Sequence, residues 1–369
     1  FNESLIGEGE FNFDAFAAGR FRLGDALGLE TTLGWNFNDR RRRINYTEIR
    51  AFQANVDLQT TDLNTSDANS SVSQFKRYID SNRLYGLFSF DLLSRLFLDV
   101  SATQEAASSF NGTAFYPAAA LAWHFVRPGN GLLLSFGQAR ISWGKTGIQP
   151  QAHRFEPLAE SNFTYGVLGD GLSISEFGGG FRIDQTPGNP DLRPETKTEL
   201  ELGVDLRLLS NRLGFSATYY RNAMRDLLFP VALPPSSGFL YEYINGGAME
   251  NEGLEGQLDF TVLKVGNLFV NSYANLHLNR NTVTDLNGMN SLDLTPGAPI
   301  ASRAVLGQPL GVLWSTRALR NADGSLDLDE NGFPQLDPVQ GIIGDPNPAW
   351  RGGLGNRAGV KSLQLHVLF

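Results

Sequence analysis

The sequence of 369 residues contains no cysteine, which excludes disulfide bonds, cysteine-ligated zinc sites and thiol catalysis. It has no apolar run near the roughly 18 residues that a transmembrane helix requires, and this excludes a helical membrane protein. Charged residues are scarce at 19%, whereas phenylalanine is plentiful at 26 residues. Because 39 acidic residues outnumber 30 basic ones, the chain has no electrostatic signature of nucleic-acid binding.

Both ends of the chain look internal to a longer protein. Residues 1–14 carry acidic groups and lack the basic, apolar leader of a secretory signal. The last residues, 361–369, stop inside an alternating apolar pattern. We therefore expect this chain to be a piece of a longer protein, truncated at both ends.

A strict alternation of apolar and polar residues dominates the sequence, and it predicts β-strands rather than helices. In the range 199–208, leucine and valine occupy every even position, and charged residues with one glycine occupy the odd positions. The other ranges with this pattern are 11–23, 28–38, 83–92, 94–103, 212–220, 257–263, 267–279 and 361–369. Their lengths match the roughly 9–11 residues that a tilted strand needs to cross a bilayer.

The links between these strands alternate between short and long. Short links are predicted at 24–27, 92–93, 127–130, 210–211, 264–266 and 358–360. Long links are predicted at 40–74, 105–112, 148–194, 227–249 and 282–348. Tight periplasmic turns that alternate with long outer loops are typical of outer-membrane barrels, in which a closed antiparallel sheet pairs every backbone group inside hydrocarbon. The sequence thus predicts about twelve strands of an all-β, antiparallel transmembrane barrel, with a soluble β-sandwich as the alternative.

Aromatic residues support this orientation. Trp35 and Phe37 precede one long link and Trp143 precedes another, while Tyr219 lies eight residues after a short turn. Amphipathic rings at the ends of strands form the aromatic girdles of membrane barrels.

Seven short segments resemble, in the same order, the C-terminal barrel region of TonB-dependent outer-membrane receptors of the SusC/RagA-like family. They are FYPAAALAW (115–123), ARISWGKTG (139–147), NPDLRPETKTELELGVDL (189–206), NRLGFSATYYRNAMRDLL (211–228), AMENEGLEGQLDF (248–260), GQPLGVLW (307–314) and GDPNPAW (344–350). The resemblance implies a barrel of roughly 22 strands with a plug, energised through a TonB box and commonly covered by a SusD-type surface lipoprotein. Residues 1–369 would then be part of one barrel domain with long outer loops 40–74, 148–194, 227–249 and 282–348. We expect these strands alone neither to close stably nor to transport.

Candidate substrate-binding residues lie on one predicted strand and in one loop. Asn271, Tyr273, Asn275 and His277 share the polar face of the strand 267–279, where amide and aromatic groups suit sugars, although any water-facing strand needs such residues. The loop 148–194 adds a set of aromatic residues, of which self-packing is an equally good explanation: Phe155, Phe163, Tyr165, Phe177 and Phe181.

Acidic residues alternate in the segment that contains Asp323, Asp327 and Asp329. Oxygen ligands at such spacing suit Ca²⁺. However, the glycine that an EF-hand loop has at its sixth position is replaced here by Leu328, so a cluster of Asp/Gly turns is the favoured interpretation and a calcium site the alternative.

Four consecutive arginines, Arg40, Arg41, Arg42 and Arg43, are predicted to begin the first long loop. Guanidinium groups pair bidentately with phosphate, so a lipopolysaccharide contact is one hypothesis and a solvated loop is the other.

The sequence offers no constellation for catalysis, so no enzymatic activity is predicted. The four histidines are scattered, and the GxSxG, HExxH and GxxxxGK[ST] patterns do not occur. Glu199, Glu201 and Asp205 lie beside Arg207 on a predicted inward face and suit a wet lumen or a plug contact. The leading hypothesis is TonB-dependent uptake of a glycan or peptide across the outer membrane; the alternatives are a passive or structural barrel and a secreted carbohydrate-binding module.

Overall fold

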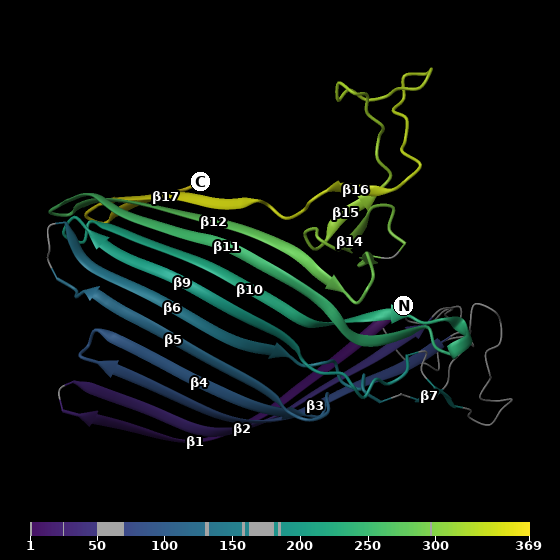
Figure 1. The fold of residues 1–369 in the computed structure, drawn as a ribbon, viewed down its shortest axis with the longest axis horizontal. Helices are drawn as coiled ribbons and strands as arrows, with labels where there is room; N and C mark the ends of the chain where they lie inside the picture. The colour runs from purple at the N-terminus through teal and green to yellow at the C-terminus, as the bar shows by residue number, and fades with distance from the viewer. Residues whose placement is uncertain are drawn as a thin grey trace, which may run out of the picture.

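The computed structural model describes residues 2–24, 26–49, 70–129, 133–156, 159–161, 181–183, 186–295 and 297–369. Within these ranges, twelve strands form one antiparallel sheet (Figure 1). Their bounds, in spatial order, are β1 (Asn2–Leu23), β2 (Leu27–Ile49), β3 (Ser70–Leu92), β4 (Leu96–Ala107), β5 (Ala114–Val126), β6 (Leu134–Ile148), β9 (Glu195–Leu208), β10 (Leu213–Ala232), β11 (Tyr241–Val265), β12 (Leu268–Leu286), β17 (Trp350–Val360) and β18 (Leu363–Leu368). The predicted all-β, antiparallel architecture is confirmed.

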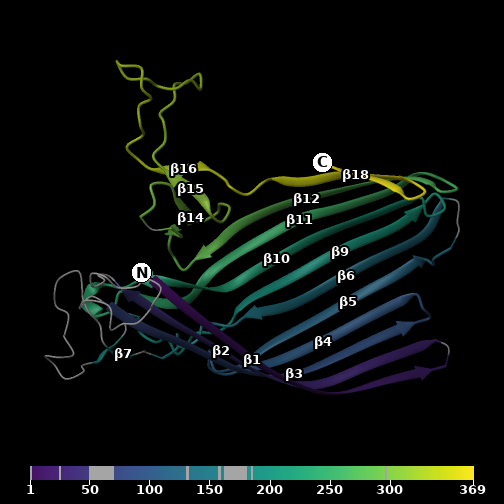
Figure 2. The same cartoon turned by 180° about the vertical axis from the view of Figure 1, so that it is seen from behind.

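Neighbouring strands in the sheet are also neighbours in the chain, apart from two places where the chain leaves the sheet and returns. β6 pairs with β9 and β12 pairs with β17, so the links between them add no strand to the main sheet. β1 and β18 lie at the two ends of the spatial order. The strands run side by side as an inclined, curved wall, as the views from both sides agree (Figures 1 and 2).

The smaller elements lie in the long links. They are β7 (Ala159–Ser161) and β8 (Phe181–Ile183), which pair with each other, the 3-10 helix η2 (Pro235–Ser237), and a separate four-stranded sheet of β13 (Ser291–Asp293), β14 (Ala301–Val305), β15 (Val312–Ser315) and β16 (Gly341–Gly344). Val283, Leu286 and Ala304 form a small apolar core where β12 meets this second sheet. Residues 316–340, here called the outer arm, project away from it (Figure 1).

The predicted loop limits 40–74, 227–249 and 282–348 are too wide at their edges. β2 continues to Ile49, paired rung by rung with β3, and β10 continues to Ala232, paired with β11 beyond a register shift at residues 224–228. Alternation of apolar and polar residues stops where a strand leaves hydrocarbon, but the backbone ladder does not, because water-exposed strands remain paired. No helix among the described residues is long and apolar enough to cross a membrane.

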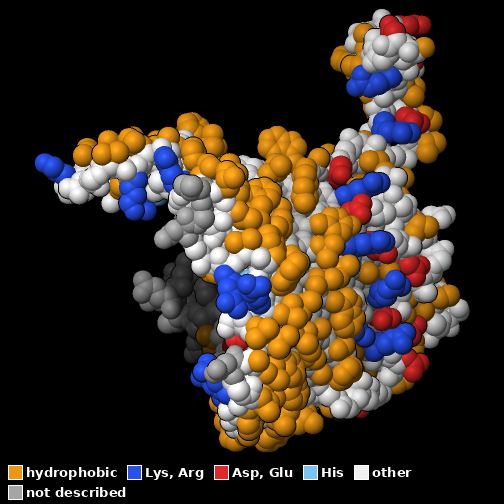
Figure 3. Space-filling model, turned by 60° about the vertical axis from the view of Figure 1, so that its left-hand side comes forward, with side chains coloured by type: hydrophobic (Ala, Val, Ile, Leu, Met, Phe, Trp, Pro, Cys, Tyr) orange, Lys and Arg blue, Asp and Glu red, His pale blue; other side chains and the backbone are white. Residues whose placement is uncertain are grey.

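The register of β2 and β3 shows how the wall separates two faces. Leu33 lies opposite Gly86, and Trp35 lies opposite Leu84, on the face here called the outward face. Asn36 lies opposite Arg83 on the other, here called the lumen face. Hydrophobic side chains form a broad continuous area on the molecular surface, and a row of basic and acidic side chains borders it on the right of the view (Figure 3). An exposed apolar area of this kind requires a lipid or protein environment.

Tyrosine rings on the lumen face lie over glycines of the adjacent strand. The pairs are Tyr85 over Gly34, Tyr220 over Gly253 and Tyr273 over Gly355, and a Cβ atom at any of these glycines would overlap the ring. Such aromatic–glycine pairs hold strand register. They keep the polar side chains described below at fixed heights on the wall.

Candidate functional site: the polar lumen wall

A polar hollow of about 700 Å³ lies on the lumen face across β6 and β9–β12. Each strand contributes every second side chain to it, so five strands bring together groups far apart in the sequence. Its lining includes Arg140, Glu201, Tyr220, Glu255, His277 and Asn279.

One end of this wall is organised by Arg140. Its Nε atom donates to Asp205 Oδ2 at 2.9 Å, and its Nη2 atom donates to Thr218 Oγ1 at 2.8 Å. Asp205 also accepts a hydrogen bond from Ser216 Oγ at 2.6 Å. The side chains of Arg140 and Asp205 remain 37% and 31% exposed, so this pair is in contact with water.

An aromatic pair forms the middle of the hollow. The Tyr220 and His277 rings stack with centroids 6.2 Å apart and an interplanar angle of 12°. The Tyr220 hydroxyl donates to Asn279 Oδ1 at 2.8 Å and lies 3.0 Å from His277 Nε2. Because the hydroxyl has only one proton, His277 Nε2 acts as the donor to the tyrosine oxygen in this arrangement. Glu255 Oε1 lies 3.8 Å from the same nitrogen.

A third group of polar contacts extends toward the outer end of the strands. Lys197 Nζ lies 2.6 Å from Glu199 Oε2, which also accepts from Asn222 Nδ2 at 2.9 Å. Asn251 Nδ2 donates in turn to Asn222 Oδ1 at 2.9 Å. The hollow is therefore lined by paired, partly hydrated groups that offer both donors and acceptors.

A more deeply buried network connects β3, β4 and β5. Glu105, 4% exposed, accepts from Arg83 Nε at 2.6 Å and from Gln149 Nε2 at 2.7 Å, both at Oε1. The Tyr116 hydroxyl donates to Oε2 of the same carboxylate at 3.3 Å. Arg40 Nη2 donates to Gln149 Oε1 at 3.2 Å, which ties the start of the long link after β6 to the wall. This network depends on strand register, so the spacing of its residues in the sequence does not indicate it.

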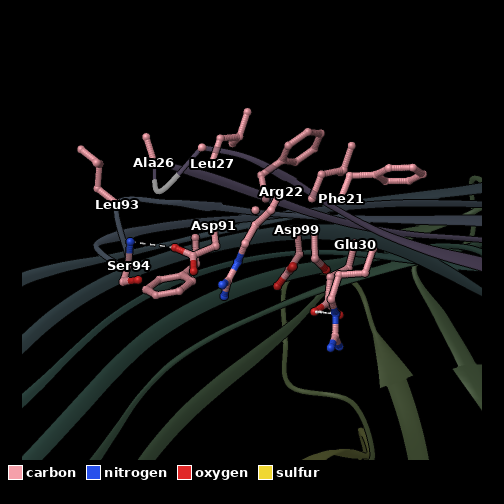
Figure 4. A pocket seen from close by; sticks show the side chains of 16 residues that line it. Phe21, Arg22, Ala26, Leu27, Glu30, Asp91, Leu93, Ser94 and Asp99 are labelled. Carbon is pink, nitrogen blue, oxygen red and sulfur yellow. Dashed lines mark hydrogen bonds and ion pairs between the residues drawn. The ribbon is translucent and has the colours of Figure 1, made fainter.

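A second hollow, of about 850 Å³, lies on the same face near the short turns of β1–β4. Figure 4 shows the charged side chains of Arg22, Glu30, Asp91 and Asp99 on one side of the strands, and the apolar Phe21 and Leu27 on the other. Arg20 Nε pairs with Glu30 Oε1 at 2.7 Å, with both side chains largely exposed. The lumen face thus carries polar groups both near the short turns and toward the outer ends of the strands.

A family model described as TonB dependent receptor-like, beta-barrel matches residues 3–357. The chain belongs to the TonB-dependent receptor β-barrel family. TonB-dependent receptors P3 and P26 of Formosa agariphila are 26% and 25% identical to it, over 78% and 77% of this chain and 31% of each relative. The chain therefore spans about a third of the length of these relatives. The family places the protein in the outer membrane, which excludes the secreted carbohydrate-binding module.

Solved structures confirm the fold. The RagAB peptide transporter superposes with a TM-score of 0.79 at 20% identity, and the match covers all of this chain and 41% of that one. The outer-membrane transporter YddB from Escherichia coli gives a TM-score of 0.56 at 10% identity, over 96% of this chain and 48% of that one. The SusC/RagA-like resemblance of the sequence agrees with the first of these matches.

Four of the predicted substrate-binding residues lie on β12. Asn271, Tyr273, Asn275 and His277 share the lumen face of β12, as the alternation predicts. Asn275 and His277 line the 700 Å³ hollow, and the other two lie nearer the short turn. Phe163 and Tyr165, with Phe177, lie outside the described residues. Substrate binding by any of these residues stays a prediction.

The outer arm uses its aspartates to cap turns. Asp323 Oδ1 accepts from the Ser325 hydroxyl and backbone N–H at 2.6 and 2.9 Å, and these bonds hold the pKa of the carboxyl below its ordinary value. Asp329 Oδ1 accepts from the backbone N–H of Asn331 at 2.9 Å. The Val339 backbone N–H, and then Arg317, lower the pKa of Asp337.

These bonds match the predicted Asp/Gly turn cluster. Asp327 Oδ1 accepts from Gln335 Nε2 at 3.4 Å. No group of three or more potential metal ligands is found among the described residues. The calcium alternative stays a prediction.

The position predicted for the four arginines is wrong: they lie within β2, not in a loop. Arg40 and Arg42 share the lumen face with Asn36, and Arg42 Nε pairs with Glu8 Oε1 at 3.0 Å. Arg41 and Arg43 point to the outward face. The alternation of an extended strand therefore divides one basic run between the two faces of the wall.

Proposed function

We propose that this chain forms part of the wall of a SusC/RagA-like receptor that takes up a nutrient, a glycan or a peptide, across the outer membrane in a TonB-dependent manner. The observation that carries the proposal is the pair of polar hollows on the lumen face of a wall that belongs to this family. The description of RagAB as a peptide transporter supports the peptide alternative. Contact with the TonB complex and with a SusD-like surface lipoprotein belongs to this proposal.

The exposure of the lumen ion pairs suits a gated passage. Lys197 and Glu199 are 38% and 28% exposed, similar to Arg140 and Asp205. Ion pairs that water reaches contribute only about 0–1 kcal/mol each, because water competes for both partners. A plug or a solute can therefore exchange partners with the wall at little cost in free energy.

Uptake by cells that express the full-length receptor tests the proposal. Labelled oligopeptides and oligosaccharides are supplied separately, with and without TonB, and with and without dissipation of the proton-motive force. We expect saturable uptake of one class that disappears without TonB. Linear uptake that persists without TonB would instead indicate the passive barrel.

Variants on β12 test whether the hollow contacts the substrate. We expect Asn275→Ala and His277→Ala to raise the substrate concentration needed for half-maximal uptake. Asn271→Ala is the matched control, since it removes the same amide group from the same face but outside the hollow. Equal effects of Asn275→Ala and Asn271→Ala would contradict a substrate contact in the hollow while leaving TonB-dependent uptake itself untouched.

A further inference from the structure

The outward face of β2 and β3 carries a group of cations beyond its aromatic residues. Arg41 lies opposite Tyr78, and Arg43 lies opposite Lys76, on the same side of the wall as Trp35 and Phe37. We call Arg41, Arg43 and Lys76 the outward basic patch. All three side chains are exposed to the surroundings of the barrel and not to its lumen.

Arg43 and Lys76 face each other directly across the two strands. Like charges in this position destabilise a sheet unless something compensates them. Among the described residues, neither cation has an acidic partner. Arg41 is different: its Nε atom donates to Asp39 Oδ1 at 3.0 Å, and its guanidinium group lies 6.0 Å from the Tyr78 ring centroid. The rung with Arg43 and Lys76 thus holds two positive charges without an acid.

The surroundings leave this rung open to an anion. Gly7 and Gly9 of β1 lie opposite Arg43 and Arg41, and a Cβ atom at either glycine would meet nothing within 4 Å. The acids on the same face, Asp39 and Asp80, form the rung below Arg41 and face the membrane side of the patch. An anion would therefore approach from the outer side of the aromatic girdle.

The height of the patch indicates the type of lipid. Phe11 and Phe13 pack on Phe37 and Trp35 with ring centroids 6.4 and 5.7 Å apart and mark the membrane interface. Arg43 lies six residues beyond Phe37, which corresponds to about 20 Å along the strand and about 15 Å in height at the usual tilt. A phospholipid headgroup layer extends only roughly 5–8 Å from the hydrocarbon. The height suits anionic groups carried on the sugars of a glycolipid.

We propose that the outward basic patch binds the phosphate groups of lipopolysaccharide in the outer leaflet, with Arg43 and Lys76 as the principal contacts. Guanidinium and ammonium groups form charge-assisted hydrogen bonds with phosphate oxygens. A bound phosphate also removes the repulsion between the two cations. Arg40 and Arg42 take no part, since they face the lumen.

The experiment uses the purified full-length receptor in detergent, incubated with lipopolysaccharide, with its dephosphorylated form, or with phosphatidylglycerol. Bound lipid per receptor is measured by mass spectrometry after gel filtration. We expect the receptor to retain lipopolysaccharide alone. In the R43Q/K76Q variant we expect its affinity to fall about thirtyfold, or about fivefold for each charge removed.

The R40Q/R42Q variant is the matched control, because it removes two charges from the same strand on the lumen face. We expect its affinity to stay within about twofold of the unmodified receptor. Equal losses in both variants, unchanged binding in R43Q/K76Q, or equal retention of phosphatidylglycerol would overturn the proposal. Heat-modifiable migration on gels checks that each variant is folded, and the single K76Q variant serves if the double variant is not.

Discussion

Glu105 offers the sharpest test of the energetics of the lumen wall. The substitution Glu105→Ala leaves Arg83, Tyr116 and Gln149 without their shared acceptor in a poorly hydrated part of the wall. Breaking a buried ion pair by removing one partner costs about 3–5 kcal/mol. Because the Arg83 side chain is 34% exposed and water recovers part of the loss, we expect the free energy of unfolding to fall by about 3 kcal/mol.

Glu105→Gln keeps an acceptor oxygen at the same position, so we expect a smaller loss of about 1–2 kcal/mol. Guanidinium-induced unfolding of the full-length receptor in detergent, followed by tryptophan fluorescence, measures both variants. Gln104→Ala is the control, since Gln104 is the neighbouring residue on the outward face. If Glu105→Ala and Gln104→Ala had the same small effect, the network would contribute no stability and the reasoning would be refuted.

Three further predictions concern other parts of the chain. Gly253→Val should push away the tyrosine ring above it and lower the free energy of unfolding by about 1–3 kcal/mol, whereas Gly256→Val, with open space at its Cβ, should not; a reversed order in the same unfolding assay would contradict the ring–glycine pairing. The lowered pKa values of Asp323 and Asp337 stabilise the outer arm above the ordinary aspartate value of 3.8. The protection of its amide protons, measured as the exchange rate relative to the intrinsic rate at each pH, should therefore fall as the pH drops below 3.8, and less pH dependence is expected in Asp323→Asn. In a calorimetric titration with Ca²⁺, we expect the full-length receptor and its Asp327→Ala variant to give the same heat signal. A signal that is present in the receptor and lost in the variant would favour the calcium site.

The sequence alone predicted the features that depend on the period of two. On β9 and β12, the polar residues of the alternation identify the side chains that face the lumen. The positions at which the alternation stops identify the short and long links. Both arise because each strand has water on one side and lipid on the other.

Contacts that depend on register were beyond the sequence. Nothing in the spacing of Tyr220 and His277 indicates that their rings stack. The two residues are on β10 and β12, and their rings come together across β11, which lies between these strands. Glu105 and Gln149 meet for a similar reason, since the chain must turn inward after β6. Hydropathy alternation predicts a loop at residues 40–43, because four consecutive charged residues interrupt it. The structure has a strand there, since charged residues can also pair in a sheet.

The wall is a single layer of backbone, and this has a consequence for how the protein tolerates change. In a helical bundle one residue often touches several environments, but here each side chain meets only one of two. A substitution scan along β9 or β12 should therefore separate into two interleaved profiles, one that accepts apolar residues and one that accepts polar residues. An insertion of one residue within a strand would exchange the two profiles for every position that follows, up to the next turn.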